Sequence, residues 1–307
     1  MSILVFGHKN PDTDTICSAI AYAELKGKLG KDVKAVRLGE VNEETKFVLD
    51  YFKVEKPELI ESVSGKEIML VDHNERTQTA NGFEEAKVLE LVDHHRISNF
   101  NGDEPLYVRM EPVGCTATII LKLFKENNLL PEPTTAGLML SAIVSDTLLF
   151  KSPTCTGCDV KAGKELAEIA GVNVEEYGLE MLKAGTALGG KSESELINMD
   201  MKIFEVDGSK IGVAQVNTVN EAELLERKEK LLAEINNIIN KEGLKFFIFA
   251  ITNILSNDST GIVAGDGNAI IEKAFNEKID NNLIALKGVV SRKKQIIPPL
   301  TKAIQEA

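Results

Sequence analysis

Short apolar runs alternate with helical patterns along the first half of the chain, and this alternation constrains the fold more than any other feature. Runs rich in Val, Ile and Leu predict strands at 3–7, 33–38, 68–71 and 88–92, and helical spacing predicts helices at 15–29 and 42–52. Strand–helix–strand order implies right-handed crossovers and a largely parallel sheet. We therefore expect an α/β fold with helices flanking a mainly parallel sheet; further helices are predicted at 115–127, 134–149, 159–170 and 174–184.

The pattern changes near Gly185, Gly189 and Gly190, which precede a polar run at 191–194. Glycine-rich polar segments are typical of linkers. Beyond this segment we predict a long charged helix at 220–241, strands at 202–206, 211–216, 246–254, 261–265 and 283–290, and a short C-terminal helix. A length of 307 residues suits two domains. The expected division is a first domain at 1–187, a hinge linker at 188–195 and a smaller α/β domain with a mixed sheet at 196–307.

The chain is acidic, with a net charge of −12 and a pI of about 5.0, which argues against a broad nucleic-acid contact surface. A small anionic substrate stays open, because bound metals and a local basic cluster can reverse the sign of the potential inside one cleft. The sequence lacks an apolar run long enough for a membrane span. Its N-terminus reads as a first core strand rather than a signal peptide. We expect a cytoplasmic protein without nucleic-acid or membrane partners.

The four cysteines are Cys17, Cys115, Cys155 and Cys158. The last two have CxxC spacing, which occurs in zinc and redox sites. A zinc site would need a second pair, which the sequence lacks, so a functional role is the weaker interpretation. Three of the four lie in apolar or helical surroundings and are better explained as small buried hydrophobic residues, in a chain that we expect to be cytoplasmic and reduced.

Every histidine of the chain stands at the C-terminal end of a predicted strand, with an aspartate close by. They are His8, His73, His94 and His95. Ligands of open parallel sheets bind outside the carboxyl ends of the strands. Four isolated surface or core histidines are a much weaker explanation of this pattern than one shared crevice. We therefore expect the His and Asp side chains to meet at one site.

The residue types in this crevice predict two divalent cations. Asp12 and Asp14 fall just before the helix that begins near residue 15, where its free N–H groups favour carboxylates. A His/Asp set suits Mn²⁺, Co²⁺ or Mg²⁺ better than structural zinc. There are more carboxylates than one ion uses, so two ions about 3.5–4 Å apart would share an aspartate and a bridging water. Asp72 is the expected bridge because its strand should be central.

Asp146 lies in a segment that is apolar on nearly all sides. A carboxylate buried there without a partner would be costly. It therefore meets either a metal or an arginine, and we favour the metal because a metal site is already inferred.

The order of these motifs resembles the DHH phosphoesterase superfamily and, within it, the family II (manganese-dependent) inorganic pyrophosphatases, over essentially the full length. The Ser-Arg-Lys-Lys motif selects the pyrophosphatases, whereas the first motif alone would indicate only the superfamily. The residues that carry the resemblance are Gly7-His8-Lys9-Asn10-Pro11-Asp12-Thr13-Asp14, Asp72-His73-Asn74, Asp93-His94-His95, 111–118, 149–154 and Ser291-Arg292-Lys293-Lys294-Gln295.

The resemblance implies an assignment of roles. One Mn²⁺, or Co²⁺, would be held by His8, Asp12 and Asp72, and a second by Asp14, Asp72, His94 and Asp146. Substrate would be bound by His95, Lys202, Arg292 and Lys293, with Mg²⁺ arriving on the substrate, and Asp14 would accept or orient a proton of the bridging water. His73 is expected to support Asp72 rather than to bind a metal. A homodimer is implied as well.

The expected function is hydrolysis of inorganic pyrophosphate to two phosphates by a metal-bridged water or hydroxide at a two-metal site between the domains, which the hinge would close over the substrate. One alternative is a DHH phosphodiesterase acting on short oligonucleotides or cyclic dinucleotides. Those relatives carry a glycine-rich segment ending in His in the second domain, whereas here every His precedes residue 96. Another alternative, a metal-binding module without turnover, is disfavoured because both the metal set and the basic set are intact.

Overall fold

The computed structural model describes residues 2–98, 100, 105–186, 188 and 190–306. The chain divides into two compact units, Met1–Gly185 (unit 1) and Thr186–Ala307 (unit 2). Each unit builds its own sheet and its own hydrophobic core. Within the described residues, no helix is both long and apolar enough to cross a membrane.

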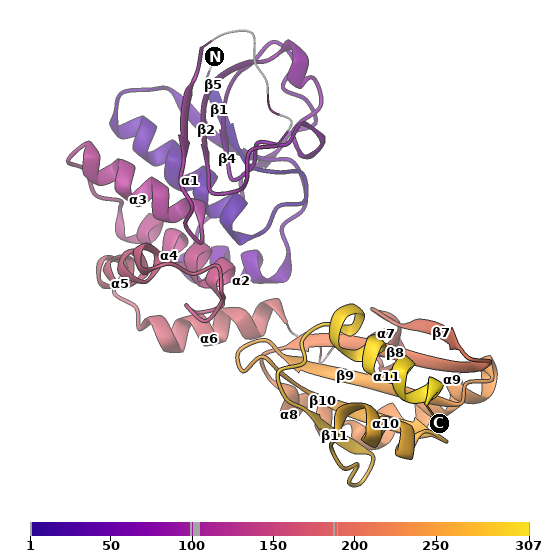
Figure 1. Cartoon of the computed structure of the whole chain (residues 1–307). Coiled ribbons are helices and arrows are strands. Elements are labelled where there is room, and N and C mark those ends of the chain that lie inside the picture. The colour runs from indigo at the N-terminus through magenta and orange to yellow at the C-terminus, as the bar shows by residue number, and fades with distance from the viewer. Residues whose placement is uncertain (1, 99, 101–104, 187, 189, 307) are drawn as a thin grey trace. The chain divides into compact units, whose positions relative to one another are not determined.

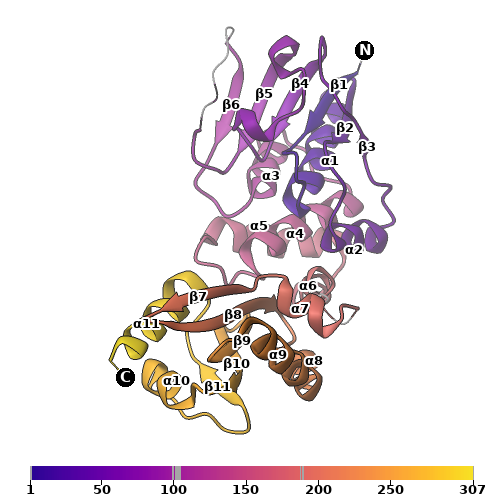
Figure 2. The ribbon, with the colours of Figure 1, turned by 90° about the vertical axis from the view of Figure 1, so that its right-hand side faces the viewer.

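Unit 1 contains a parallel sheet with the strand order β3-β2-β1-β4-β5-β6 (Figures 1 and 2). The chain fills one side of β1 first and then returns to the other side at β4. The carboxyl ends of β1 and β4 therefore flank a topological switch point, where open α/β sheets bind their ligands. The strands are β1 (Ile3–Phe6), β2 (Val33–Arg37), β3 (Glu58–Leu59), β4 (Glu67–Val71), β5 (Lys87–Asp93) and β6 (Tyr107–Met110).

Helices and short turns cover this sheet. Helix α1 contacts β1, β2 and β4, and α3 contacts β5. Helix α4 is buried on nearly all sides and packs against α1 and α5, and a Cβ at Gly137 would lie 2.2 Å from the Phe52 ring. The helices are α1 (Thr13–Lys28), α2 (Glu43–Phe52), α3 (Thr116–Glu126), α4 (Pro133–Thr147), α5 (Gly157–Ala170) and α6 (Val174–Gly185), with 3₁₀ turns at Arg76–Gln78 and Phe83–Glu85.

Unit 2 has the strand order β11-β10-β9-β8-β7, in which only β8 and β9 run parallel to each other. The central strand β9 is buried on both faces, with alternate residues in two separate core clusters. The elements are α7 (Glu193–Asn198), β7 (Lys202–Val206), β8 (Ser209–Thr218), α8 (Glu221–Leu225), α9 (Lys228–Glu242), β9 (Phe246–Asn253), β10 (Asp258–Gly265), α10 (Asn268–Phe275), β11 (Leu283–Leu286), a π-helical turn (Arg292–Ile296) and α11 (Ile297–Gln305).

The structure confirms the expected fold class: a parallel α/β unit followed by a unit with a mixed sheet. It also corrects several element predictions. The predicted helix at 220–241 is broken after Leu225, and Arg227 at the break donates hydrogen bonds to Glu193 Oε1 and the Lys191 carbonyl. The last predicted strand ends at Leu286, before Gly288 adopts a positive φ of 68°.

Part of the predicted hinge at 188–195 is helical, because α7 begins at Glu193 with Ser192 as its N-cap. Gly189 lies outside the described residues. Elements β3, β6, α7 and α10 were not predicted from the sequence. The boundaries at 187 and 195, and the hinge role itself, stay predictions.

Candidate metal centre

The loop after β1 carries the first ligand candidates into the switch point. Asp12 is the N-cap of α1, and its Oδ1 accepts a hydrogen bond from the Thr15 amide at 2.9 Å. Gly7 permits a close approach of this helix, since a Cβ there would lie 2.6 Å from Thr15 Cγ2. The turn therefore places His8, Asp12 and the start of α1 beside the end of β4.

Asp72, the residue after β4, occupies the centre of the cluster. It is only 1% exposed and adopts φ 59°, a left-handed conformation that costs energy for a non-glycine residue and that is found preferentially at functional sites. Its Oδ2 lies 3.5 Å from His8 Nε2, and its Oδ1 lies 3.4 Å from His94 Nε2. Each carboxylate oxygen thus faces a different histidine, as a bridging ligand requires.

The first ligand group consists of His8, Asp12 and Asp72. Their candidate ligand atoms lie within 4.8 Å of one another, and His8 Nε2 is 3.3 Å from Asp12 Oδ2. These are the residues that the resemblance implies for one metal.

The second ligand group surrounds His94 Nε2. This nitrogen lies 3.4 Å from Asp72 Oδ1, 3.8 Å from Asp146 Oδ2 and 3.9 Å from Asp14 Oδ2. His94 Nδ1 is 3.1 Å from the Val113 carbonyl, which can only accept a hydrogen bond, so Nδ1 carries the proton. Nε2 then faces the carboxylates, and a metal bound there would take the place of its proton, an arrangement common among ligating histidines.

The charges of the cluster fit divalent cations. Burial, together with the charge of Asp14, raises the pKa of Asp72 to about 7, and burial also raises the pKa of Asp146. Burial lowers the pKa of His94, but the hydrogen bond to Asp72 and the charge of Asp14 outweigh it and raise the pKa to about 9. Buried carboxylates that repel one another in this way are stabilised by a shared cation.

His95 pairs with Asp93 and also belongs, with Asp72 and His94, to a group of potential ligand atoms, in which His95 Nδ1 lies 3.6 Å from Asp72 Oδ1. Asp93 is fully buried and accepts hydrogen bonds from His95 N at 3.0 Å and from Asn74 Nδ2 at 2.6 Å. His95 Nδ1 lies 2.9 Å from the same carboxylate, and the His95 side chain is 52% exposed. Asp93 therefore orients the ring, and within the described residues the ion pairs of His95 involve Nδ1 and not Nε2.

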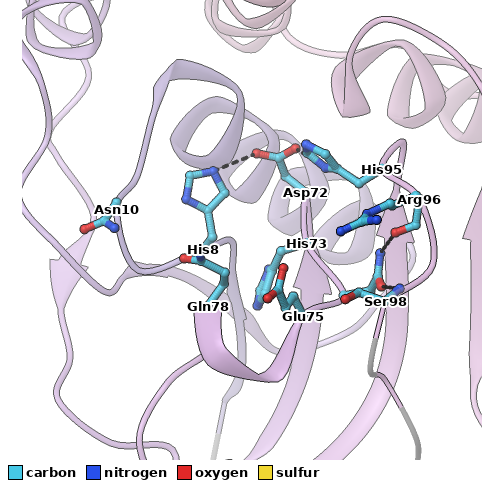
Figure 3. Close-up of a pocket in the computed structure, with 10 residues that line it drawn as sticks. His8, Asn10, Asp72, His73, Glu75, Gln78, His95, Arg96 and Ser98 are labelled. Carbon is cyan, nitrogen blue, oxygen red and sulfur yellow. Dashed lines mark hydrogen bonds and ion pairs between the residues drawn. The ribbon is translucent and has the colours of Figure 1, made fainter. Parts of the chain in front are cut away.

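A pocket of about 340 Å³ opens beside Asp72 (Figure 3). His73 lies at its inner side, buried, with Nδ1 3.0 Å from the Val71 carbonyl, and burial lowers the pKa of His73 to about 4. The lining residues are His8, Asn10, Asp72, His73, Asn74, Glu75, Gln78, His95, Arg96 and Ser98.

Sequence reasoning missed the hydroxyl groups that hold the Asp72 carboxylate in place. Thr15 Oγ1 donates to Asp72 Oδ2 at 2.6 Å, and Thr116 Oγ1 donates to Asp72 Oδ1 at 3.2 Å. The Thr116 amide donates to Asp14 Oδ2 at 2.8 Å. Cys115 was predicted as a plain buried residue; it is buried, but it also lies with Asp14 and Asp146 in a third group of potential ligand atoms.

A buried carboxylate on α5 fixes the loop that carries Thr116. Asp159 Oδ2 accepts from the Gly114 amide at 2.9 Å and the Thr156 amide at 2.7 Å, and Oδ1 accepts from Thr118 Oγ1 at 2.6 Å. Thr156 and Asp159 form a capping box, which explains the segment between Cys155 and Cys158 without a metal. In the described residues, neither of these cysteines joins a potential ligand group.

Asp159→Asn should lower the affinity for Mn²⁺ about 10- to 100-fold, the usual effect of losing a residue that orients metal ligands. Manganese titration followed by electron paramagnetic resonance would measure it. Ser141→Ala is the matched control, because it removes a buried hydrogen bond to Tyr177 in the same unit and should leave the affinity unchanged. Equal affinities in Asp159→Asn and wild type would show that the loop does not depend on this carboxylate.

The arginine and the two lysines that are predicted to bind substrate lie in unit 2. Arg292 begins the π-helical turn, and its side chain, 11% exposed, pairs with Asp200 Oδ1 at 2.8 Å through Nη1. The Arg292 amide donates to Gln215 Oε1 at 2.9 Å. Lys202 opens β7, and Lys202 and Lys293 are both exposed. Asp200 and Gln215 carry no signal in the sequence, because they act through contacts between distant segments.

Comparison with known proteins identifies the family. The DHH family N-terminal domain matches residues 2–143, and the DHHA2 domain matches residues 179–303. The chain is 59% identical to a probable manganese-dependent inorganic pyrophosphatase of Exiguobacterium, covering 98% of each chain. It is 56% identical to a protein of the same name from Bacillus cereus, covering 99% of each.

Comparison with solved structures supports the same family. A protein of Methanococcus jannaschii, assigned to the family II inorganic pyrophosphatases, is 43% identical and matches with a TM-score of 0.63, covering 99% of this chain and 100% of that one. An exopolyphosphatase-related protein from Bacteroides fragilis, 13% identical with a TM-score of 0.52, shares the fold; the match covers 99% of this chain and 92% of that one. The chain therefore belongs to the family of manganese-dependent, or family II, inorganic pyrophosphatases.

Proposed function

We propose that this protein hydrolyses inorganic pyrophosphate to two phosphates. The observation that carries the proposal is the position of the Asp72 carboxylate. Its two oxygens face His8 and His94 and so join two ligand groups into one site. The relatives that match over nearly the full chain are named manganese-dependent inorganic pyrophosphatases, which supports pyrophosphate as the substrate.

The proposed ligands are His8, Asp12 and Asp72 for one cation, and Asp14, Asp72, His94 and Asp146 for the other. When bound, two Mn²⁺ or Co²⁺ ions would lower the pKa of a shared water and neutralise phosphate charge. The His/Asp donor set suits these ions. Mg²⁺ is proposed to arrive with the substrate.

The side chains have separate roles in this proposal. Asp14 accepts from Ser18 Oγ at 2.5 Å and from the Thr116 amide at 2.8 Å, so it is held in place to accept or orient a proton of the attacking water. His95, oriented by Asp93, presents Nε2 to a phosphate oxygen. Arg292 offers a planar fork, while Lys202 and Lys293 act as point charges on the phosphates.

Further proposals concern the oligomeric state, the cellular compartment and the binding partners. We propose a homodimer that works in the cytoplasm without nucleic-acid or membrane partners. The four cysteines are free thiols, as is usual in a reducing compartment, and the net charge of −12 disfavours binding of a polyanion.

The test is release of phosphate from pyrophosphate, p-nitrophenyl phosphate and a short oligonucleotide, with Mn²⁺, Co²⁺ or Mg²⁺ added in turn. Turnover of pyrophosphate with Mn²⁺ is expected. Absence of that activity in metal-loaded protein would contradict the proposal, whereas cleavage of the oligonucleotide would favour the phosphodiesterase alternative. Metal analysis of the same preparation gives the ion and its stoichiometry.

A further inference from the structure

The pocket beside Asp72 extends beyond the metal ligands, and its far wall contains an arginine that the proposed chemistry does not use. His8, Asp72 and His95 form the wall next to the ligand groups, and Asn10, Gln78 and Ser98 contribute neutral polar side chains. With about 340 Å³, it has room for a phosphate group in addition to water. Figure 3 shows the Arg96 guanidinium turned toward Asp72 and His73.

We propose that Arg96 forms an anion subsite in unit 1, which binds one phosphate group of pyrophosphate and retains orthophosphate after hydrolysis. This inference rests on the proposed function for the identity of the anion. The subsite itself is supported by the pocket, by the backbone that positions Arg96 and by one buried polar atom, His73 Nε2, without a hydrogen-bond partner.

The backbone at Arg96 is tied to the metal centre by Asn74. Asn74 Nδ2 donates to the Arg96 carbonyl at 3.0 Å and to Asp93 Oδ2 at 2.6 Å, and Asn74 Oδ1 accepts from the Ser98 amide at 2.6 Å. Asp93 in turn orients His95. The base of the Arg96 side chain is therefore held relative to the ring that is proposed to contact phosphate.

The guanidinium of Arg96 has no ion pair within the described part of the chain. Many other arginines here do have acidic partners: Arg37 pairs with Glu40, Arg109 with Glu111, and Arg292 with Asp200. An arginine that lines a pocket without a carboxylate partner is available to an anionic ligand. Its planar fork matches two phosphate oxygens.

A buried polar atom without a hydrogen-bond partner also indicates that the pocket takes up a ligand. His73 Nε2 is buried and, within the described residues, has no hydrogen-bond partner. Buried polar atoms of native proteins are nearly always paired with protein, water or ligand. Because Nδ1 donates to the Val71 carbonyl, Nε2 can only accept a hydrogen bond, so its partner would be a donor: a water in the hydration shell of the anion, or the hydroxyl group of a protonated phosphate.

Within the described residues, no carboxylate of the pocket forms an ion pair with Arg96. Asp72 accepts hydrogen bonds from Thr15 and Thr116 and faces His8 and His94. Glu75 accepts a hydrogen bond from Thr77 Oγ1 at 2.8 Å. Of the described residues that line the pocket, Arg96 is the one with a permanent positive charge.

The test is calorimetric titration of orthophosphate into the full-length, Mn²⁺-loaded protein. Arg96→Gln should raise the dissociation constant of orthophosphate, and the KM for pyrophosphate, about 10- to 100-fold, as expected for loss of charge-assisted hydrogen bonds. Arg96→Lys should recover part of the loss, since it keeps the charge without the fork. Lys87→Gln removes a positive charge from an exposed pair with Glu67, outside the pocket, and should change both constants less than about twofold.

The outcomes separate the two proposals. Unchanged phosphate binding in Arg96→Gln, in protein whose wild type hydrolyses pyrophosphate, overturns the subsite and leaves the function standing. Weakened phosphate binding in Arg96→Gln, in protein whose wild type does not hydrolyse pyrophosphate, supports the subsite and overturns the function. Loss of Mn²⁺ from Arg96→Gln also overturns the subsite, because Arg96 would then act by holding the metal centre.

Discussion

Asp72→Asn is expected to lower pyrophosphate turnover on the order of a thousandfold, the scale of losing preorganised charge at a reacting centre. The physical reason is the placement of its oxygens, one 3.5 Å from His8 Nε2 and the other 3.4 Å from His94 Nε2. An amide offers one oxygen and one N–H₂ donor, so it cannot serve two cations at once. Both ligand groups should therefore weaken together.

Equilibrium dialysis against Mn²⁺, with turnover measured on the same samples, checks this result. Asp93→Asn is the matched control, because Asp93 is equally buried on the neighbouring strand but forms its hydrogen bonds with His95 and Asn74 rather than with any of the proposed ligands. It should keep the bound manganese while changing activity through His95. Near-normal turnover in Asp72→Asn would rule out the bridging role.

The clustering of the candidate ligands could be predicted from the sequence because their positions follow from fold class. His8, Asp72 and His94 come one or two residues after β1, β4 and β5, and neighbouring parallel strands bring their carboxyl ends together. Asp146 was predicted from the cost of burying a carboxylate in an apolar helix, and it lies 3.8 Å from His94 Nε2. Both arguments need only local pattern and topology.

The groups that orient these ligands could not be predicted in this way. Thr116 reaches Asp72 because Asp159, on another helix, binds the Gly114 amide and the Thr118 hydroxyl. Such contacts join segments that are far apart in the sequence, and threonine is common in any chain. Asn74 is a similar case, since its role depends on the path of the backbone at Arg96.

Predictions of helices and strands failed where tertiary contacts override the local conformational preference of the sequence. The predicted helix at 220–241 has continuous helical spacing, but Arg227 binds Glu193 on α7 and the helix is interrupted there. Strand β6 has two exposed apolar residues, Tyr107 and Val108, so it lacks the buried pattern by which β1, β2, β4 and β5 were found. A weak edge strand of this kind becomes visible only when its partner β5 is placed.

Arg292→Gln is expected to lower kcat about 10²- to 10³-fold while leaving manganese affinity unchanged. Arg292 is proposed to contact the substrate, and within the described residues its basic turn contains no metal ligand candidate, so its loss should act on phosphate charge alone. Its contacts with the Asp200 carbonyl and carboxylate both use Nη1. A guanidinium has five N–H donors, which leaves others for phosphate oxygens.

Steady-state kinetics with pyrophosphate, at saturating Mn²⁺, separates this role from simple charge attraction. Lys294→Gln is the matched control: it removes an exposed cation from the same turn, and it should alter KM by less than about threefold, as a solvent-screened charge does. Asp200→Asn keeps Arg292 but weakens the pair that orients it, so it should fall between wild type and Arg292→Gln if that pair positions the guanidinium. Equal losses in Lys294→Gln and Arg292→Gln would mean that the turn contributes only its charge, and the assignment of Arg292 as a residue that contacts the reacting phosphate would then be wrong.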